Sequence, residues 1–133
     1  MVKILVAEDV ELNAEVLLEI LEMEGFETAH AQNGEEAVEK FLQSAPGEFD
    51  IILMDMQMPV MDGCAASAEI RSMDRPDAKT VTIFACTANT FQEDRDRALA
   101  SGMNDFLPKP VDIQLLLQKL SAGTADGREG ANL

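Results

Sequence analysis

The sequence has no tryptophan, no tyrosine and only two cysteines, Cys64 and Cys86, among its 133 residues. Two cysteines without the spacing of metal ligands give no support for a disulfide framework and predict free thiols in a reducing, cytoplasmic setting. Basic residues are also scarce, since 10 Lys and Arg stand against 25 Asp and Glu, for a formal net charge of -15. This imbalance argues against non-specific nucleic-acid binding, because phosphate backbones attract Lys and Arg.

Long hydrophobic runs are missing as well. The apolar run near the N-terminus, Ile4 to Ala7, is far too short for a signal peptide or a spanning helix. The length suits one domain with a proper core and is too short for two. With 47% hydrophobic residues, the composition is that of an ordinary globular protein.

Short apolar runs alternate with stretches whose apolar residues recur at helical spacing. The expected strands are residues 3–7, 27–31, 50–54, 81–86 and 105–107. The expected helices are residues 12–23, 34–42, 63–72, 92–100 and 113–120, with 75–77 as a loop. Five strands alternating with five helices predict an α/β domain over residues 1–121, with a parallel sheet covered on both faces. Residues 122–133, rich in Gly, Ala and charge, are expected to be a disordered tail or linker.

Polar residues follow four of the predicted strands, where ligands of open parallel sheets collect. Glu8 and Asp9 follow the first strand, Asp55 the third, Thr87 the fourth and Lys109 the fifth. Carboxylate oxygens suit Mg²⁺ with several retained waters. The Lys109 ammonium and the Thr87 hydroxyl could hold an anion. The sheet edge is therefore expected to combine a cation site with an anion site.

The stretch LMDMQMPVMDG, residues 53–63, places Asp55 directly after an apolar run. An ionised carboxylate there is costly unless function requires it. A carboxylate nucleophile beside a metal, an ammonium and a hydroxyl is a device for receiving a phosphoryl group. Taken singly, each residue also has an ordinary structural explanation as a capping acid, a strand threonine or a solvated lysine. Their convergence at one edge favours the functional interpretation.

Four motifs in this order and spacing closely resemble the receiver domains of two-component response regulators. They are Glu8-Asp9, residues 53–63, Thr87-Ala88-Asn89 and Pro108-Lys109-Pro110. The resemblance covers residues 3–120 and implies a doubly wound, flavodoxin-like sheet of strand order 2-1-3-4-5. It also implies that Asp55 is the phosphoacceptor, and that Thr87 and Lys109 contact the phosphoryl oxygens.

The resemblance further implies a magnesium site. Mg²⁺ would be bound by Asp9, Asp55 and the backbone carbonyl of Gln57, while Glu8 would act mostly through a metal-bound water. The family often has two aspartates where this chain has Glu8-Asp9. This departure concerns only the details of metal binding.

Three further residues receive expectations of their own. Phe106 has the position of the family's aromatic switch, whose rotamer is coupled to Thr87, and a plain core aromatic is the alternative. The Lys109–Pro110 peptide bond is expected to be cis by resemblance. His30, the only histidine, is expected on the second strand as a surface or half-buried residue.

Three functions compete for this pattern. The favoured one is a phosphoacceptor switch that changes the partner affinity of the face formed by the fourth helix, fifth strand and fifth helix. A Mg²⁺-dependent aspartyl phosphohydrolase would need a second aspartate where Gln57 stands. A flavin-binding domain would need a Ser/Thr/Gly-rich phosphate loop in place of residues 8–11, EDVE. A degenerate receiver that acts without phosphorylation is a further alternative, and no conventional enzyme activity is expected.

Partners follow from the same resemblance. A histidine kinase or a histidine phosphotransfer protein is the expected donor, and receivers often dock such partners near the first helix. That helix carries Glu11, Glu15, Glu19 and Glu22, which are interpreted as a solvated face. No output domain or DNA-binding module is recognisable, and the motif wording is similar to receivers of hybrid histidine kinases. The chain is therefore expected to be a phosphorelay intermediate without direct nucleic-acid or membrane contacts.

Overall fold

The computed structural model describes residues 2–88, 92–109 and 111–125. Five strands form one parallel sheet in the order β2-β1-β3-β4-β5. They are β1 (Lys3–Ala7), β2 (Glu27–Ala31), β3 (Ile51–Asp55), β4 (Thr82–Thr87) and β5 (Asp105–Pro108). This arrangement confirms the predicted doubly wound sheet and its strand order.

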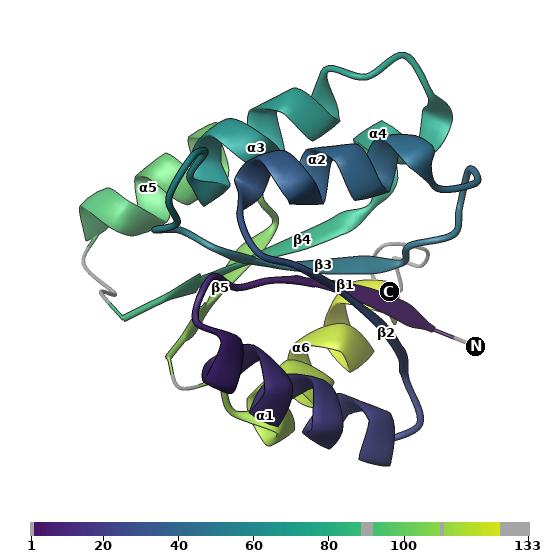
Figure 1. The fold of residues 1–133 in the computed structure, drawn as a ribbon, viewed down its shortest axis with the longest axis vertical. Coiled ribbons are helices and arrows are strands. Elements are labelled where there is room, and N and C mark those ends of the chain that lie inside the picture. The colour runs from purple at the N-terminus through teal and green to yellow at the C-terminus, as the bar shows by residue number, and fades with distance from the viewer. Residues whose placement is uncertain (1, 89–91, 110, 126–133) are drawn as a thin grey trace.

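Helices cover both faces of the sheet, as Figure 1 shows, with α2, α3 and α5 on one side and α1 and α6 on the other. The helices are α1 (Glu11–Met23), α2 (Gly34–Gln43), α3 (Gly63–Arg71), α4 (Pro76–Thr80), α5 (Gln92–Ala100) and α6 (Ile113–Ala125). Helix α2 begins at Gly34, as predicted, because Asn33 caps it. The Asn33 side chain accepts a hydrogen bond from the Glu36 N–H at 2.8 Å.

Two secondary-structure predictions were wrong. The expected loop at residues 75–77 contains the start of α4, so the described chain has six helices and not five. Pro76 occupies the first turn of this helix, where its missing N–H costs nothing, and the buried Ala78 anchors it. Helix α6 ends at Ala125 and not at Leu120, so residues 122–125 of the expected tail are helical. Extending an existing helix gains one hydrogen bond per residue, which alanine favours.

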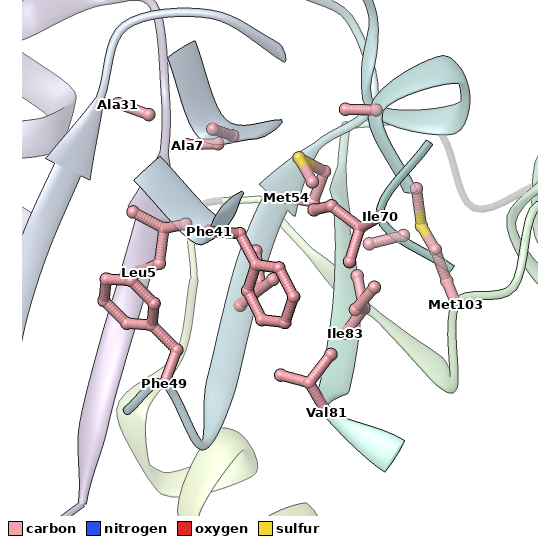
Figure 2. Close-up of a cluster of buried hydrophobic side chains, with 14 of the residues drawn as sticks. Leu5, Ala7, Ala31, Phe41, Phe49, Met54, Ile70, Val81, Ile83 and Met103 are labelled. Atoms are coloured by element: carbon pink, nitrogen blue, oxygen red, sulfur yellow. The ribbon is translucent and has the colours of Figure 1, made fainter. Parts of the chain in front are cut away.

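Two hydrophobic clusters hold the layers together. One lies under α2 and α3 and includes Phe41, Met54 and Ile70, which Figure 2 shows side by side with other buried residues. The other lies under α1 and α6 and includes Leu21 and Leu116. Burying a side chain of this size contributes about 1.5–3 kcal/mol. The sheet is therefore packed against helices on both faces, which holds the polar residues at the strand ends in fixed positions.

The strand register aligns those polar residues. Ala7 pairs with Met54 and Asp55 with Cys86, so β1, β3 and β4 end at the same edge. Strands β3 and β4 each begin and end one residue later than predicted, which makes Asp55 and Thr87 their last residues. A Cβ atom at Gly63 would overlap the carbonyl oxygen of Asp55. Helix α3 can thus start directly against the backbone of Asp55 only because that position is glycine.

Candidate functional site

Three carboxylates meet at the carboxyl edge of the sheet. One oxygen each from Glu8, Asp9 and Asp55 lies within 4.8 Å of the others. Glu8 is 6% exposed and Asp55 is 4% exposed, whereas Asp9 faces solvent. Buried like charges destabilise one another unless a cation intervenes. The cluster is therefore a site for positive charge.

Lys109 supplies part of that positive charge. Its Nζ lies 2.7 Å from Oδ2 of Asp55 and 3.2 Å from Oε1 of Glu8. The Lys109 N–H donates to the carbonyl oxygen of Thr87 at 2.8 Å, which fixes the lysine directly after β5. The structure thus brings together four of the site residues predicted from the sequence, at the ends of β1, β3 and β5. They are Glu8, Asp9, Asp55 and Lys109.

Backbone donors orient the two buried carboxylates. The Gln57 N–H donates to Oδ1 of Asp55 at 3.2 Å, and the Val10 N–H donates to Oε2 of Glu8 at 3.1 Å. Each of the two carboxylates thus accepts a hydrogen bond from the backbone N–H two residues further along the chain. The metal contact predicted for the Gln57 carbonyl stays a prediction.

Burial dominates the electrostatics of the site. It raises the pKa of the Asp55 carboxyl, although the hydrogen bonds from Lys109 and from the Gln57 N–H act in the opposite direction. Burial by itself would lower the pKa of Lys109, but the carboxylates of Asp55 and Glu8 outweigh it and raise that pKa. An ion pair alone would lower the pKa of the acid, so the rise at Asp55 shows that one lysine does not offset the burial of its charge.

The donor set fits Mg²⁺. All three side chains offer oxygen atoms, which hard divalent cations prefer, and the exposure of Asp9 leaves room for retained waters. Three carboxylates face one ammonium group, so an excess of negative charge remains for a divalent cation to balance. The residues present are thus compatible with the magnesium ion that the resemblance implies.

Thr87 and Phe106 lie along the neighbouring strands. Thr87, the last residue of β4, is 8% exposed and pairs in register with Pro108. Phe106 is half-buried at the margin of the core, and the Arg95 guanidinium carbon lies 4.4 Å from its ring centroid. It packs against the core while part of its ring stays accessible, and its role as a switch stays a prediction.

Two features of the site were missed by sequence reasoning. Nε2 of His30, which is half-buried as expected, lies 2.9 Å from the backbone oxygen of Glu8. The β1–β2 register pairs Val6 with His30 and would have indicated this contact had it been known. A groove of about 450 Å³ also runs along α1 to Lys109, with Leu12 69% exposed and Val16 50% exposed. Their helical spacing predicts the helix but does not show whether another element covers these two side chains.

The motif residue Asn89 lies outside the described residues, and so does Pro110, whose peptide bond with Lys109 was expected to be cis. Among the helices of the described ranges, none has the length and apolar character needed to cross a membrane.

A parallel sheet of this order, with an acidic cluster and a lysine at its carboxyl edge, defines the class of doubly wound signalling receivers. Residues 4–121 match the family model of the response regulator receiver domain, and the chain belongs to that family. It is 41% identical to two-component system protein A of Emericella nidulans, over 88% of this chain and 17% of that protein. It is 37% identical to hybrid signal transduction histidine kinase L of Dictyostelium discoideum, over 82% of this chain and 6% of that protein. The chain thus spans only a small part of such relatives.

Solved structures agree with this assignment. The receiver domain of sensor histidine kinase PA1611 from Pseudomonas aeruginosa, which has a magnesium ion coordinated in its active-site cleft, superimposes with a TM-score of 0.79 at 36% identity. That match covers 90% of this chain and 94% of the other. A second match, with a TM-score of 0.80 at 32% identity, comes from the co-crystal structure of the Saccharomyces cerevisiae phosphotransfer protein Ypd1 and the receiver domain of Ssk1. It covers 99% of this chain and 92% of the other.

Proposed function

We propose that this chain is a phosphoacceptor receiver in which Asp55 takes a phosphoryl group from a phosphohistidine of a histidine kinase or phosphotransfer protein. The observation that carries the proposal is the placement of the Asp55 carboxylate. It is 4% exposed, 2.7 Å from Lys109 and within 4.8 Å of the carboxylates of Glu8 and Asp9. A structural aspartate has no need of this costly environment.

The proposed step is a transfer between two nucleophiles. A carboxylate oxygen of Asp55 forms a bond to phosphorus while the phosphorus–nitrogen bond of the phosphohistidine breaks and the imidazole leaves with the bonding electron pair. Lys109 orients the Asp55 carboxylate and is placed to contact a phosphoryl oxygen, with the Thr87 hydroxyl as a second donor. Mg²⁺, held by Asp9, Asp55 and the backbone carbonyl of Gln57, with Glu8 acting mostly through a metal-bound water, would supply neutralisation of charge on the transferring oxygens.

The alternatives are less well supported. A phosphohydrolase would need a general acid two residues after the nucleophile, and Gln57 instead contributes its backbone N–H to Asp55 at 3.2 Å. A receiver that works without phosphorylation has no use for a buried acid cluster with its lysine. In this chain Lys109 pairs with Asp55 and Glu8 at 2.7 and 3.2 Å, and the oxygens of Glu8, Asp9 and Asp55 lie within 4.8 Å of one another.

The apolar groove along α1 is our candidate for donor docking. Leu12, Val16 and Ile20 line it together with Val111, and Glu8 and Lys109 of the acidic site also belong to its lining. A partner helix that lies in this groove could therefore present a histidine to Asp55. The co-crystal of Ypd1 with the Ssk1 receiver domain supports a phosphotransfer protein as the class of partner.

The downstream partner is proposed to bind the α5-β5-α6 face, which contains Phe106. We place the domain in the cytoplasm, either alone or within a hybrid histidine kinase, in a phosphorelay without direct nucleic-acid or membrane contacts. Similarity to hybrid kinases and to response regulators such as SSK1 of Arthrobotrys oligospora supports this setting.

The test is the intact mass after incubation with acetyl phosphate, with and without Mg²⁺. We expect a Mg²⁺-dependent gain of one phosphoryl group that is lost in Asp55→Asn. Asp96→Asn, on the surface of α5 where Asp96 accepts a hydrogen bond from Gln92, is the matched control and should gain the group normally. No gain by the folded natural chain would instead indicate an interaction module that works without phosphorylation.

A further inference from the structure

His30 contacts the acidic site from the neighbouring edge strand. The Glu8 N–H donates to the carbonyl oxygen of Ala31 at 3.0 Å, which continues the β1–β2 ladder by one hydrogen bond. Strand β2 ends at Ala31, two residues before Asn33, whose N–H would be the next backbone donor in register for the Glu8 carbonyl. The carbonyl oxygen of Glu8 is reached instead by Nε2 of His30, at 2.9 Å. An imidazole side chain thus takes the place of a backbone donor.

The chemistry of this contact assigns the tautomer. A carbonyl oxygen only accepts hydrogen bonds, so the proton must be on Nε2 of His30. The Glu8 carbonyl belongs to the peptide unit that ends at the Cα of Asp9, and that unit is planar and rigid. Fixing both the N–H and the C=O of Glu8 therefore fixes where the backbone of Asp9 begins.

Asp9 is the acid of the cluster that most needs such support, because it faces solvent while Glu8 and Asp55 are buried. We propose that His30 is a positioning residue for the divalent-cation site, acting through the Glu8–Asp9 peptide unit to keep the Asp9 carboxylate beside those of Glu8 and Asp55. This inference rests on the proposed magnesium site and adds to it a residue that bears no ligand atom of its own.

Two variants separate the hydrogen bond from the bulk of the ring. Glutamine and methionine have nearly the same length, but only glutamine can donate to the Glu8 carbonyl. Both side chains are uncharged, so the two variants have the same net charge. Partners that orient the groups of a metal site typically change metal affinity by about 10- to 100-fold when removed. Because His30 acts through the backbone, we expect a loss of about 3- to 10-fold in Mg²⁺ affinity for His30→Met and less than about twofold for His30→Gln.

Mg²⁺ affinity would be measured by calorimetry, and folding of each variant by urea unfolding. Thr28→Val is the control, since it removes a hydrogen bond of the same strand, from the Thr28 hydroxyl to Glu22 at 2.7 Å, away from the acids. It should leave Mg²⁺ affinity unchanged. Equal affinity in the natural chain and His30→Met would overturn the proposal, as would an equal loss in the Met and Gln variants.

A second measurement needs no variant. His30 is the only histidine, so its ring nitrogens give a single pair of signals in a nitrogen-15 NMR spectrum. A proton on Nε2 is expected, and a proton on Nδ1 would overturn the proposal even if His30→Met fails to fold. If the natural chain binds Mg²⁺ and is phosphorylated while His30→Met does so equally well, only the role of His30 fails. If the natural chain binds no Mg²⁺, both proposals fail.

Discussion

The ammonium group of Lys109 lies 2.7 Å from Oδ2 of Asp55, across 54 residues of sequence. The same nitrogen is 3.2 Å from Oε1 of Glu8. One cation therefore bridges two buried carboxylates that come from β3 and from the end of β1. The same contact therefore stabilises the metal-free domain and involves the carboxylate that we propose as phosphoacceptor. Unfolding measurements and Mg²⁺ binding test these two roles separately.

Removing the charge of Lys109 should destabilise the metal-free protein. Unpairing a fully buried ion pair costs about 3–5 kcal/mol, and since Lys109 is itself 25% exposed we expect about 1–3 kcal/mol for Lys109→Met. Lys109→Arg keeps the charge and should cost clearly less. Urea unfolding without Mg²⁺ measures both losses. Equal losses in the two variants would show that packing, and not charge, makes this contact important.

Mg²⁺ should stabilise the fold through the same acids. A ligand at 100 times its dissociation constant stabilises the native state by about 2.7 kcal/mol, which a thermal melt with increasing Mg²⁺ would detect as a rising Tm. Asp9→Asn should remove most of this rise, because Asp9 is one of the three clustered acids. Glu11→Gln changes a nearby exposed charge outside the cluster and should keep the rise. If the melting temperature of the natural chain does not respond to Mg²⁺, the cluster is not a divalent-cation site.

The turn after Pro59 carries backbone strain. Val60 has a φ of 71°, and the Met61 N–H donates to the Pro59 carbonyl at 2.7 Å, which closes a γ-turn around Val60. Left-handed backbone costs a residue with a Cβ about 1–2 kcal/mol, and Val60 is 74% exposed, so little packing offsets it.

Val60→Gly should therefore increase the free energy of unfolding by about 0.5–1.5 kcal/mol, after the larger chain entropy of glycine is subtracted. Val60→Ala relieves only the crowding of the branched side chain, so its free energy of unfolding should lie between those of the natural chain and Val60→Gly. Urea midpoints of the three proteins would decide this, and a less stable glycine variant would mean that the valine side chain makes a contact worth more than the strain.

The pair of Arg75 and Asp77 should make stability depend on pH. The Arg75 guanidinium, 2.6 Å away, and the Gly47 N–H lower the pKa of the Asp77 carboxyl despite some desolvation. A lowered folded-state pKa adds stability that is present above the ordinary Asp range near pH ~4 and is lost as the pH falls through the folded pKa.

Asp77→Asn should therefore be less stable than the natural chain by about 1 kcal/mol at pH 7, and the difference should shrink as the pH falls below about 4. Urea unfolding of both proteins at pH 7 and at acidic pH measures it, and the other carboxyl groups cancel in the comparison. A difference that stays constant with pH would assign the loss to geometry rather than to the charge of Asp77.

Much of the fold could be predicted from sequence because its signals are local. Apolar runs predict β1 and β3, and the parallel topology then places Glu8, Asp55 and Lys109 at one edge without any knowledge of contacts. The short helix at Pro76 was missed because five residues are too few for a periodic pattern, and proline and aspartate are equally common in turns.

Other features depend on distances that a sequence does not contain. The bond from His30 to the Glu8 carbonyl needs the β1–β2 register and the end of β2 at Ala31. The exposure of Leu12 and Val16 depends on where α6 and the chain after β5 lie against α1. An apolar position at helical spacing indicates an interior face only when another element covers it.

The apolar groove on α1 is part of a molecule with a formal net charge of -15. Two copies of this domain repel each other at long range, so the exposed Leu12 and Val16 are shielded from self-association in dilute salt without being covered by any side chain. A basic protein, in contrast, is drawn toward the same surface before any contact forms. Charge can thus favour one partner over another through the rate of association, before the two proteins are close enough for the shape of the groove to matter.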